Sequence, residues 1–328
     1  MNVGPYRGKV AIATRKGRAV LAAALLAGAG LLAGCGESAV AGPEPGTDPE
    51  VLMLGHIPSE NSNNIDEEYQ LVMEVIEKET GKKVEFQPAT SYAAVIEAQR
   101  AGKVQLASYG PFSYVVAKDS GVGITALGFL AETKDSTGGY HSAAWVPKGS
   151  PIKDLAGFKG KKVCFVDPTS TSGYLYPSAG LLEAGLDPKK DVTPVFAGGH
   201  DSSVIAIANQ QCEAGFSQDS MPEELSKSGQ VADGAVSEVW KSALIPSSPI
   251  VMSDSLSAPL KEKLTDIFAN KLNVDWLSAN GYCDSADACP LPGEESTSAW
   301  GFKPVEDSTY DGIREVCTIT KSDSCQVS

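Results

Sequence analysis

The chain has 328 residues, of which 42% are hydrophobic and 21% charged, a composition typical of a soluble globular protein with one or two α/β domains. Its formal net charge of −14 argues against a nucleic-acid partner, because nucleic-acid binding needs a basic face. A fibrous or largely disordered protein is also excluded by this composition.

The N-terminal 34 residues have the pattern of a targeting segment. A basic region precedes an apolar stretch, Ala19–Leu32, which is shorter than the roughly 20 residues that a membrane span needs. The stretch ends in L-A-G-C-G, which resembles the lipobox of bacterial lipoproteins; the alternative is an ordinary secretory signal with an incidental cysteine. We expect a signal peptide over residues 1–34, acylation of Cys35 and a solvated linker over residues 35–50. The protein would then be extracytoplasmic and held on the bacterial cell membrane by lipid.

Hydrophobic periodicity after the linker predicts alternating strands and helices. The first run comprises Val51–Ile57 (strand), Asp66–Thr80 (helix), Lys83–Gln87 (strand), Ser91–Ala101 (helix), Val104–Tyr109 (strand) and a helix that begins at Pro111. The second run comprises Lys162–Val166 (strand), Ser172–Ala184 (helix), Thr193–Phe196 (strand), Ser202–Asn209 (helix) and Glu213–Ser217 (strand). A further helix is predicted over Lys261–Ser278.

Two α/β units joined by two crossings are therefore expected. The first crossing falls near Tyr140–Pro147 and the return near Leu244–Met252. We predict lobe 1 over residues 51–142 and 248–328, and lobe 2 over residues 143–247. A cleft between two such lobes, at the carboxyl ends of parallel strands, is the preferred ligand site.

Polar residues lie where three of these strands end. The stretch D-P-T-S-T-S-G-Y places Ser170, Thr171 and Ser172 at the start of a helix, where hydroxyls and free backbone N–H groups can hold an oxyanion. A plain N-cap is the alternative. A second cluster, I-P-S-E-N-S-N-N, contains Ser59 and can donate into the cleft or form a simple turn. His200, in F-A-G-G-H-D-S, precedes a helix and is a third candidate donor.

Six cysteines remain for disulfides, and fifteen connectivities are possible. Proximity favours Cys283–Cys289 and Cys317–Cys325, which leaves Cys164–Cys212. Metal binding is disfavoured, because the chain has no C-x-x-C pair with adjacent histidines. A serine hydrolase is disfavoured too, since G-x-S-x-G is missing and His56, His141 and His200 are the only histidines.

Four motifs, in order, resemble the phosphonate-binding proteins of ABC importers, the phosphate/phosphite/phosphonate branch of the periplasmic binding proteins. They are Ser91–Pro111, Asp167–Pro177, Ala197–Ser202 and Trp240–Val251. The resemblance implies a two-lobe α/β fold of type II, a Venus flytrap, with two hinge crossings. It further implies that the protein hands its ligand to a membrane permease. We expect a monomer that is not an enzyme and carries no metal or cofactor.

Carried over motif by motif, the resemblance assigns ligand contacts to Ser170, Thr171, Ser172, His200 and two tyrosines, Tyr92 and Tyr140. Relatives that bind aminoethylphosphonate carry two acids for its ammonium group, and the matching positions here are Ser220 and Ser248. Phosphate, phosphite or a small alkylphosphonate such as methylphosphonate is therefore the expected ligand.

Asp219, beside Ser220, is predicted to accept a hydrogen bond from a P–OH group of that ligand. Two alternatives stay open: the protein is a receptor for larger phosphonates such as 2-aminoethylphosphonate, or it is a ligand-binding sensor domain.

Overall fold

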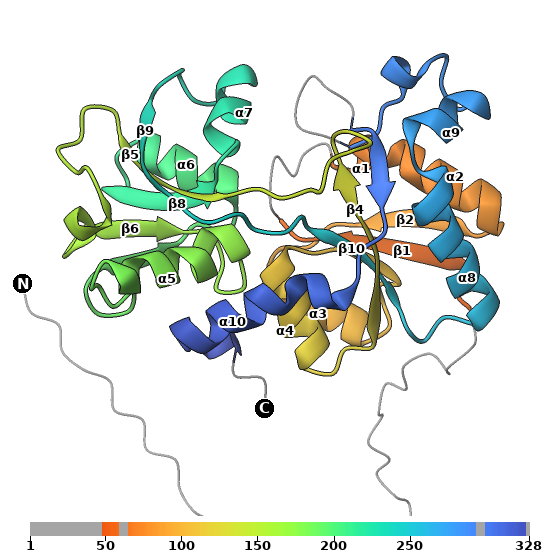
Figure 1. Ribbon diagram of the computed structural model, residues 1–328, viewed down its shortest axis with the longest axis horizontal. Coiled ribbons are helices and arrows are strands. Elements are labelled where there is room, and N and C mark those ends of the chain that lie inside the picture. Colours follow the sequence, from red (N-terminus) through yellow and green to blue (C-terminus); the bar gives the residue numbers. More distant parts are fainter. Residues whose placement is uncertain (1–47, 59–64, 293–298, 326–328) are drawn as a thin grey trace, which may run out of the picture. The chain divides into compact units, whose positions relative to one another are not determined.

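The computed structural model describes residues 48–58, 65–292 and 299–325, and within them two β-sheets carry helices on their faces (Figure 1). The first sheet has the order β11-β4-β10-β3-β1-β2 and consists of β1 (Val51–His56), β2 (Lys83–Gln87), β3 (Leu106–Ser108), β4 (Ile124–Ala131), β10 (Pro249–Ser253) and β11 (Gly301–Lys303). The second has the order β7-β6-β8-β5-β9 and consists of β5 (Ser142–Pro147), β6 (Lys162–Phe165), β7 (Thr193–Phe196), β8 (Ala214–Gln218) and β9 (Val236–Lys241). We call the first sheet with its helices lobe 1, and the second sheet with its helices lobe 2.

Both sheets are mixed. β2, β1 and β3 are parallel, as are β7, β6 and β8, so the predicted β-α-β rhythm forms one half of each sheet. The remaining strands, β4, β10 and β11 in lobe 1 and β5 and β9 in lobe 2, pair antiparallel with their neighbours. The α/β two-lobe fold predicted from the sequence is confirmed.

Local sequence explains the helices of lobe 1. These are α1 (Ile65–Glu68), α2 (Gln70–Thr80), α3 (Tyr92–Arg100), α4 (Pro111–Asp119), α8 (Ala258–Asp266), the π-helical turn η3 (Ile267–Lys271), α9 (Val274–Ala279) and the short turn η4 (Ala286–Ala288). α2 buries one face and ends at Gly81, whose φ of 74° is accessible to glycine without strain. Ser91 caps α3 by accepting a hydrogen bond from Ala94 N, and Pro111 occupies the first turn of α4.

The helices of lobe 2 are η1 (Leu155–Phe158), the π-helical turn η2 (Thr171–Leu175), α5 (Tyr176–Glu183), α6 (His200–Ala208) and α7 (Met221–Lys227). η2, α6 and α7 follow the parallel strands β6, β7 and β8, which end at the same edge of the sheet, whereas η1 follows β5, which runs antiparallel to β8. The predicted helix over 172–184 is thus a π-helical turn followed by α5. Lobe 2 is closed by apolar clusters on both faces of the sheet.

Two chain segments connect the sheets, one between β4 and β5 and the other between β9 and β10. They pair with each other, because Tyr140 N donates to Ile245 O at 3.0 Å and Ile245 N donates to Tyr140 O at 2.8 Å. Gly139 N also donates to Ser247 Oγ at 2.7 Å. These bonds tie the two segments together where the chain passes between lobes. The predicted lobe 2, residues 143–247, contains the strands of the second sheet completely, except that β5 begins one residue earlier, at Ser142.

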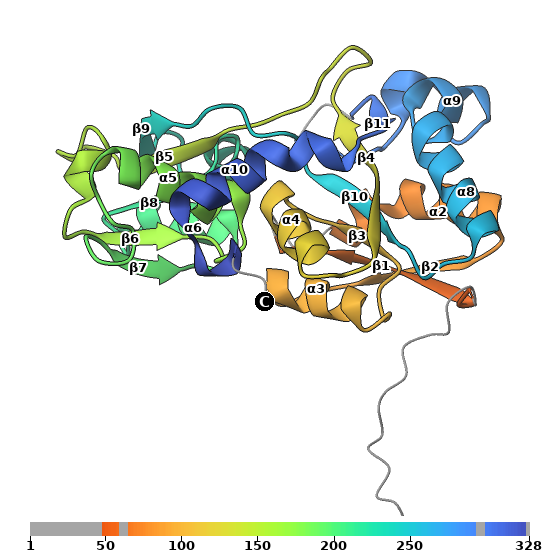
Figure 2. The same cartoon turned by 60° about the horizontal axis from the view of Figure 1, so that its bottom comes forward.

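The C-terminal region contacts both lobes. After η5 (Asp307–Tyr310), helix α10 (Asp311–Thr320) lies against α4 of lobe 1 and α5 of lobe 2, and the turn η6 (Asp323–Cys325) follows (Figure 2). Tyr310 is buried and donates its hydroxyl to Ser247 O at 3.0 Å. The Lys189 ammonium pairs with the Asp323 carboxylate at 2.7 Å. The C-terminal region therefore adds contacts between lobes beyond the two connecting segments.

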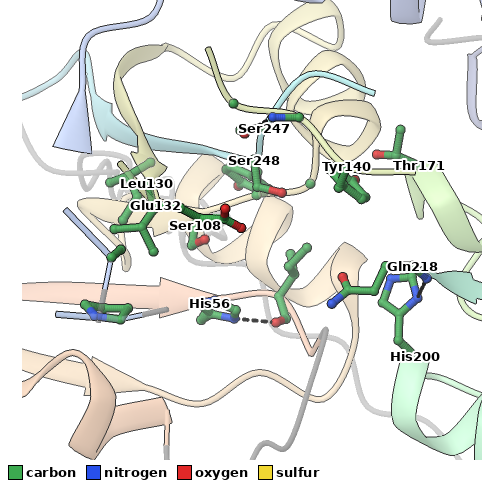
Figure 3. A pocket seen from close by; sticks show the side chains of 18 of the residues that line it. His56, Ser108, Leu130, Glu132, Tyr140, Thr171, His200, Gln218, Ser247 and Ser248 are labelled. Atoms are coloured by element: carbon green, nitrogen blue, oxygen red, sulfur yellow. Dashed lines mark hydrogen bonds between the residues drawn. The ribbon is translucent and has the colours of Figure 1, made fainter. Parts of the chain in front are cut away.

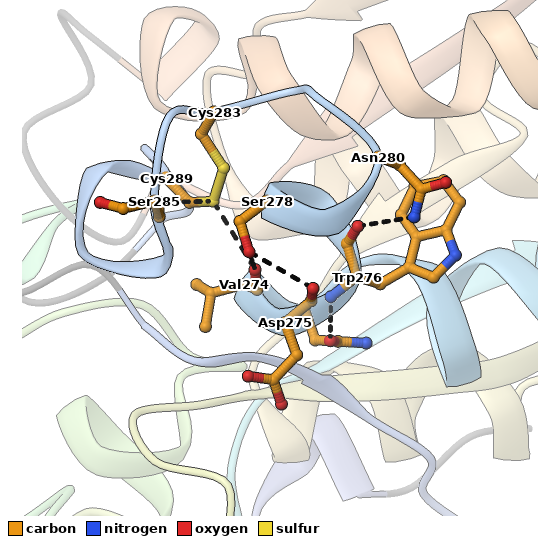
Figure 4. Close-up of a disulfide and its surroundings, with 9 residues drawn as sticks. Val274, Asp275, Trp276, Ser278, Asn280, Cys283, Ser285 and Cys289 are labelled. Atoms are coloured by element: carbon orange, nitrogen blue, oxygen red, sulfur yellow. Dashed lines mark hydrogen bonds between the residues drawn. A yellow bond between two sulfur atoms is a disulfide. The ribbon is translucent and has the colours of Figure 1, made fainter.

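Three disulfides join the cysteines in pairs within the described residues: Cys164–Cys212, Cys283–Cys289 and Cys317–Cys325. Cys164–Cys212 links β6 to the segment after α6 in the core of lobe 2. Figure 4 shows Cys283–Cys289 beside α9. The connectivity matches the pairing that proximity along the chain favoured.

The N-terminal expectations lie outside the described residues: the signal peptide over 1–34, acylation of Cys35 and most of the linker over 35–50. Within the described part of the chain, no helix has the length and apolar character needed to cross a membrane.

Replacing both Cys164 and Cys212 by alanine is expected to lower the free energy of unfolding by about 4 kcal/mol, because this disulfide closes a loop with a sequence separation of 48 residues. The separations of 6 and 8 residues in the other two predict a smaller loss, about 2–3 kcal/mol each. Urea denaturation of the three double-alanine variants, with their remaining disulfides oxidised, measures and compares these losses of free energy. Equal losses for all three pairs would contradict it.

Candidate ligand-binding site

A cavity of about 350 Å³ is lined by residues of both lobes (Figure 3). Lobe 1 contributes the carboxyl ends of β1 and β3, with His56 and Ser108. Lobe 2 contributes the turn after β6, the start of α6 and the end of β8. The connecting segments contribute Tyr140 and Ser248. The cavity thus lies where the parallel strands of both sheets end, as the fold predicts.

The hydroxyl-rich turn after β6 is ordered by its own side chains. Ser170 Oγ accepts a hydrogen bond from Gly173 N at 3.0 Å and so caps η2. A Cβ on Gly173 would lie 2.3 Å from Val166, so this glycine is required for packing against the end of β6 rather than for approach of a ligand. As acceptors in such bonds, hydroxyls keep their own hydrogen for another partner.

Thr171 links this turn to lobe 1. Its Oγ1 accepts a hydrogen bond from Phe112 N at 2.8 Å, and both residues are buried. Phe112 is in the first turn of α4, where backbone N–H groups have no partner within the helix. The hydroxyl turn of lobe 2 therefore meets a helix N-terminus of lobe 1 at the cavity.

Two buried hydroxyls at this site are short of hydrogen-bond partners: Tyr109 Oη has none among the described residues, and Ser172 Oγ has only the nearby hydroxyl of Tyr140. Tyr109 is 0% exposed and lines the cavity, and its pKa is raised by burial. Ser172 is 1% exposed, is not among the lining residues and is close to the hydroxyl of Tyr140. An unpaired buried hydroxyl costs roughly 1–3 kcal/mol, so the hydroxyl of Tyr109 indicates a partner that enters the cavity.

Tyr140 stands at the centre of the hydroxyl groups. Burial raises its pKa to about 12, against the opposing effect of the nearby hydroxyls of Thr171, Ser172 and Ser248. These side chains come from lobe 2 and from both connecting segments. Tyr140 therefore stays protonated at neutral pH and can donate.

His200 is a neutral donor. It is 4% exposed, and burial lowers its pKa to about 3. Gln218 N donates to His200 Nδ1 at 3.0 Å, so the ring proton is on Nε2. His200 lines the cavity and is the first residue of α6. A second lobe 2 helix thus offers an N–H donor without a positive charge.

The charge of the lining is unusual for an anion site. No lysine or arginine is among the described lining residues, whereas Glu68, Glu132 and Glu224 are. Any anion bound here is therefore held by hydroxyls, N–H groups and helix termini, as in preorganised oxyanion sites. The described residues also contain no group of His, Cys, Asp and Glu that could hold a metal ion.

Most of the site residues predicted from sequence meet at this cavity. Those in its lining are Tyr92, Tyr140, Ser170, Thr171 and His200; Ser172 is not in the lining but is close to Tyr140. Ser59 lies outside the described residues. Asp219 is not in the lining: its Oδ1 accepts from His141 N at 3.1 Å and its Oδ2 pairs with Lys241 at 3.2 Å.

Other lining residues were not found from sequence. In the stretch Ala214–Ser220 (A-G-F-S-Q-D-S), Gln218 is the residue that lines the cavity. Its Nε2 donates to Ser220 Oγ at 3.1 Å. Tyr109 follows β3 directly, and its position between a strand end and a helix start was the signal that could have identified it. Glu132 follows β4, a strand that the periodicity did not predict.

Comparisons with known proteins agree with this geometry. A family profile described as the periplasmic substrate-binding protein of a phosphonate ABC transporter matches residues 54–273. The chain is 42% identical over 287 residues to the phosphate-import protein PhnD of Mycolicibacterium smegmatis, covering 85% of this chain and 88% of that protein. It is 31% identical over 223 residues to the phosphonates-binding periplasmic protein of Escherichia coli, covering 67% and 65%.

Two solved structures share the fold. A binding-protein component of an ABC phosphonate transporter from Pseudomonas aeruginosa superposes with a TM-score of 0.71 at 26% identity, covering 84% of this chain and 87% of that chain. PhnD1 of Prochlorococcus marinus in complex with methylphosphonate superposes with a TM-score of 0.66 at 21% identity, covering 84% and 100%.

His200 makes stability depend on pH. Its pKa is about 3 in the folded chain and about 6.5 in the unfolded chain, so only the unfolded chain takes up a proton between these values. The free energy of unfolding should therefore fall by about 1–2 kcal/mol from pH 7 to pH 5 through this residue. His200→Gln should remove that contribution, whereas His141→Gln, outside the cavity, should keep it. Urea denaturation at both pH values tests this, and an unchanged pH dependence in His200→Gln would contradict it.

Proposed function

Because the chain belongs to the family of periplasmic substrate-binding proteins of phosphonate ABC transporters, we propose that it binds a small phosphorus oxyanion in the cavity between its lobes. Phosphate, phosphite and a small alkylphosphonate such as methylphosphonate are the candidate ligands. The observation that carries this proposal is the buried hydroxyl of Tyr109, which has no partner among the described residues and lines a cavity without lysine or arginine.

The donors fit the shape of a tetrahedral oxyanion. Lobe 2 offers the hydroxyl hydrogens of Ser170, Thr171 and Ser172 and the Nε2–H of His200. Lobe 1 and the connecting segment offer tyrosine hydroxyls, for which we propose Tyr92, Tyr109 and Tyr140. Asp219 is left out of this set because its carboxylate is engaged by His141 N and Lys241.

The names of relatives support this ligand class. The Mycolicibacterium relative is named for phosphate import, and a structural neighbour was solved with methylphosphonate. Neutral donors in a desolvated site are effective for an oxyanion because local dipoles act at short range, whereas the overall negative charge of the chain is screened.

The receptor role includes features beyond the described residues. We propose that Cys35 is acylated, so that the protein is anchored on the outer side of the membrane and delivers its ligand to an ABC permease. We further propose that it acts as a monomer and as a receptor without catalysis.

A larger phosphonate, such as 2-aminoethylphosphonate, is the second candidate ligand. The cavity volume of about 350 Å³ and the carboxylates in its lining favour it, because they leave space and charge for an ammonium-bearing tail.

Isothermal titration of the purified protein, unfolded and refolded to remove bound ligand, should show tight binding of phosphate, phosphite or methylphosphonate. Binding of 2-aminoethylphosphonate and sulfate should be weaker. Preference for 2-aminoethylphosphonate would favour the second candidate, and lack of binding to all phosphorus anions would refute the proposed function.

Ser172→Ala is expected to weaken binding of the preferred anion by about 10- to 100-fold, because a hydrogen bond to a charged group contributes roughly 1.5–3 kcal/mol. Its free energy of unfolding should change little, since the hydroxyl that it removes has no partner besides the nearby hydroxyl of Tyr140. Ser178→Ala is the matched control: this serine is equally buried but donates to Tyr174 O at 2.7 Å. It should lose stability and keep affinity. The reverse pattern, measured by titration and urea denaturation, would contradict the role of Ser172.

A further inference from the structure

Glu132 is a lining carboxylate to which the oxyanion site as described assigns no role. It directly follows β4, and its backbone carbonyl accepts a hydrogen bond from Trp300 N at 3.1 Å, which fixes its backbone at the end of β4. Figure 3 shows its side chain beside Ser108 on the lobe 1 side of the cavity, away from His200 and Gln218.

The Glu132 carboxylate has no hydrogen bond or ion pair with the described residues, and the nearby cations have other partners. Lys134 pairs with Asp275 at 2.8 Å, and Lys303 Nζ donates to Ser136 O at 2.7 Å. Glu68 and Glu224, the other lining carboxylates, each interact with another group. The Glu132 carboxylate is therefore available to a ligand.

A second observation at the same cavity also indicates a ligand. The hydroxyl of Tyr109, adjacent to Ser108 in the chain, is fully buried, lines the cavity and has no partner among the described residues. A ligand that enters the cavity thus meets donors and an acceptor. The titratable side chains in the lining besides Glu132 are Glu68, Glu224, His56, His200, Tyr69, Tyr92, Tyr109 and Tyr140.

An ionised carboxylate can accept hydrogen bonds but cannot donate them, and the same is true of an oxyanion oxygen that carries no hydrogen. An anion that bears a P–OH group can donate that hydrogen to Glu132 and still accept from lining hydroxyls of lobe 1, such as those of Ser108 and Tyr109. Glu132 is exposed in the structure, and an anion of the same shape without the hydrogen would place two negatively charged acceptors against each other with no hydrogen between them.

We propose that Glu132 is a specificity-determining residue that selects a phosphorus oxyanion carrying a P–OH group and rejects anions of the same shape that lack this hydrogen. The proposal rests on the proposed function and deepens it. It gives Glu132 the role that the sequence had suggested for Asp219, whose carboxylate is engaged elsewhere.

Two ligands that differ by one hydrogen test the proposal. Below the second pKa of methylphosphonate, methylphosphonate and methanesulfonate are both monoanions with a methyl group and three oxygens, and only the phosphonate carries an O–H. Titration of the full chain should show that the unsubstituted protein prefers methylphosphonate by about 100-fold or more.

In Glu132→Gln, the carboxamide can donate to an oxygen that has no hydrogen, so the preference should shrink by at least about tenfold, mainly through tighter binding of methanesulfonate. Glu223→Gln is the matched control, because Glu223 pairs with Lys227 on α7 and is not in the lining. It should keep the full preference.

The outcomes separate this inference from the proposed function. Binding of methylphosphonate with an unchanged preference in Glu132→Gln would overturn the role of Glu132 and leave the proposed function standing. If Glu132→Gln loses affinity only for 2-aminoethylphosphonate, this would also overturn the role of Glu132, because it would identify Glu132 as the partner of the ligand's ammonium group. If the unsubstituted protein binds no phosphorus anion, the proposed function itself fails.

Discussion

The hydrogen bond from Phe112 N to Thr171 Oγ1 joins the first turn of α4 in lobe 1 to the hydroxyl turn of lobe 2. It depends on a physical constraint, which is that helix N-termini have backbone N–H groups without a partner in the helix. At this junction the termini of α4 and α6 and the turn η2 are all at the cavity. The fold thereby gathers neutral donors from two sheets at one point, and the chemistry of the site follows from that.

Neutrality is the property that these donors share. The Nδ1 atom of His200 accepts from Gln218 N, which keeps the ring uncharged with Nε2–H as the donor, and burial keeps Tyr140 protonated. With no lysine or arginine in the described lining, binding depends on geometry rather than on net charge. Such a site can discriminate between anions of the same charge, because each hydrogen on the ligand must find an acceptor.

The parts of the site that the sequence predicted lie where strands end and helices begin. The turn around Thr171 and the position of His200 were identified because hydroxyls and histidine at a helix start indicate donors. Asp219 is not in the lining, whereas Gln218, the last residue of β8, is. Glu132 could not be found, because β4 pairs antiparallel and interrupts the β-α-β rhythm on which the prediction relied.

A crystal structure of the protein with bound methylphosphonate tests the central claim most directly. The account predicts phosphonate oxygens within hydrogen-bond distance of Ser172 Oγ, Tyr109 Oη and His200 Nε2, with no lysine or arginine in contact. A phosphonate held outside this cavity, or one that leaves both buried hydroxyls without a partner, would contradict the account.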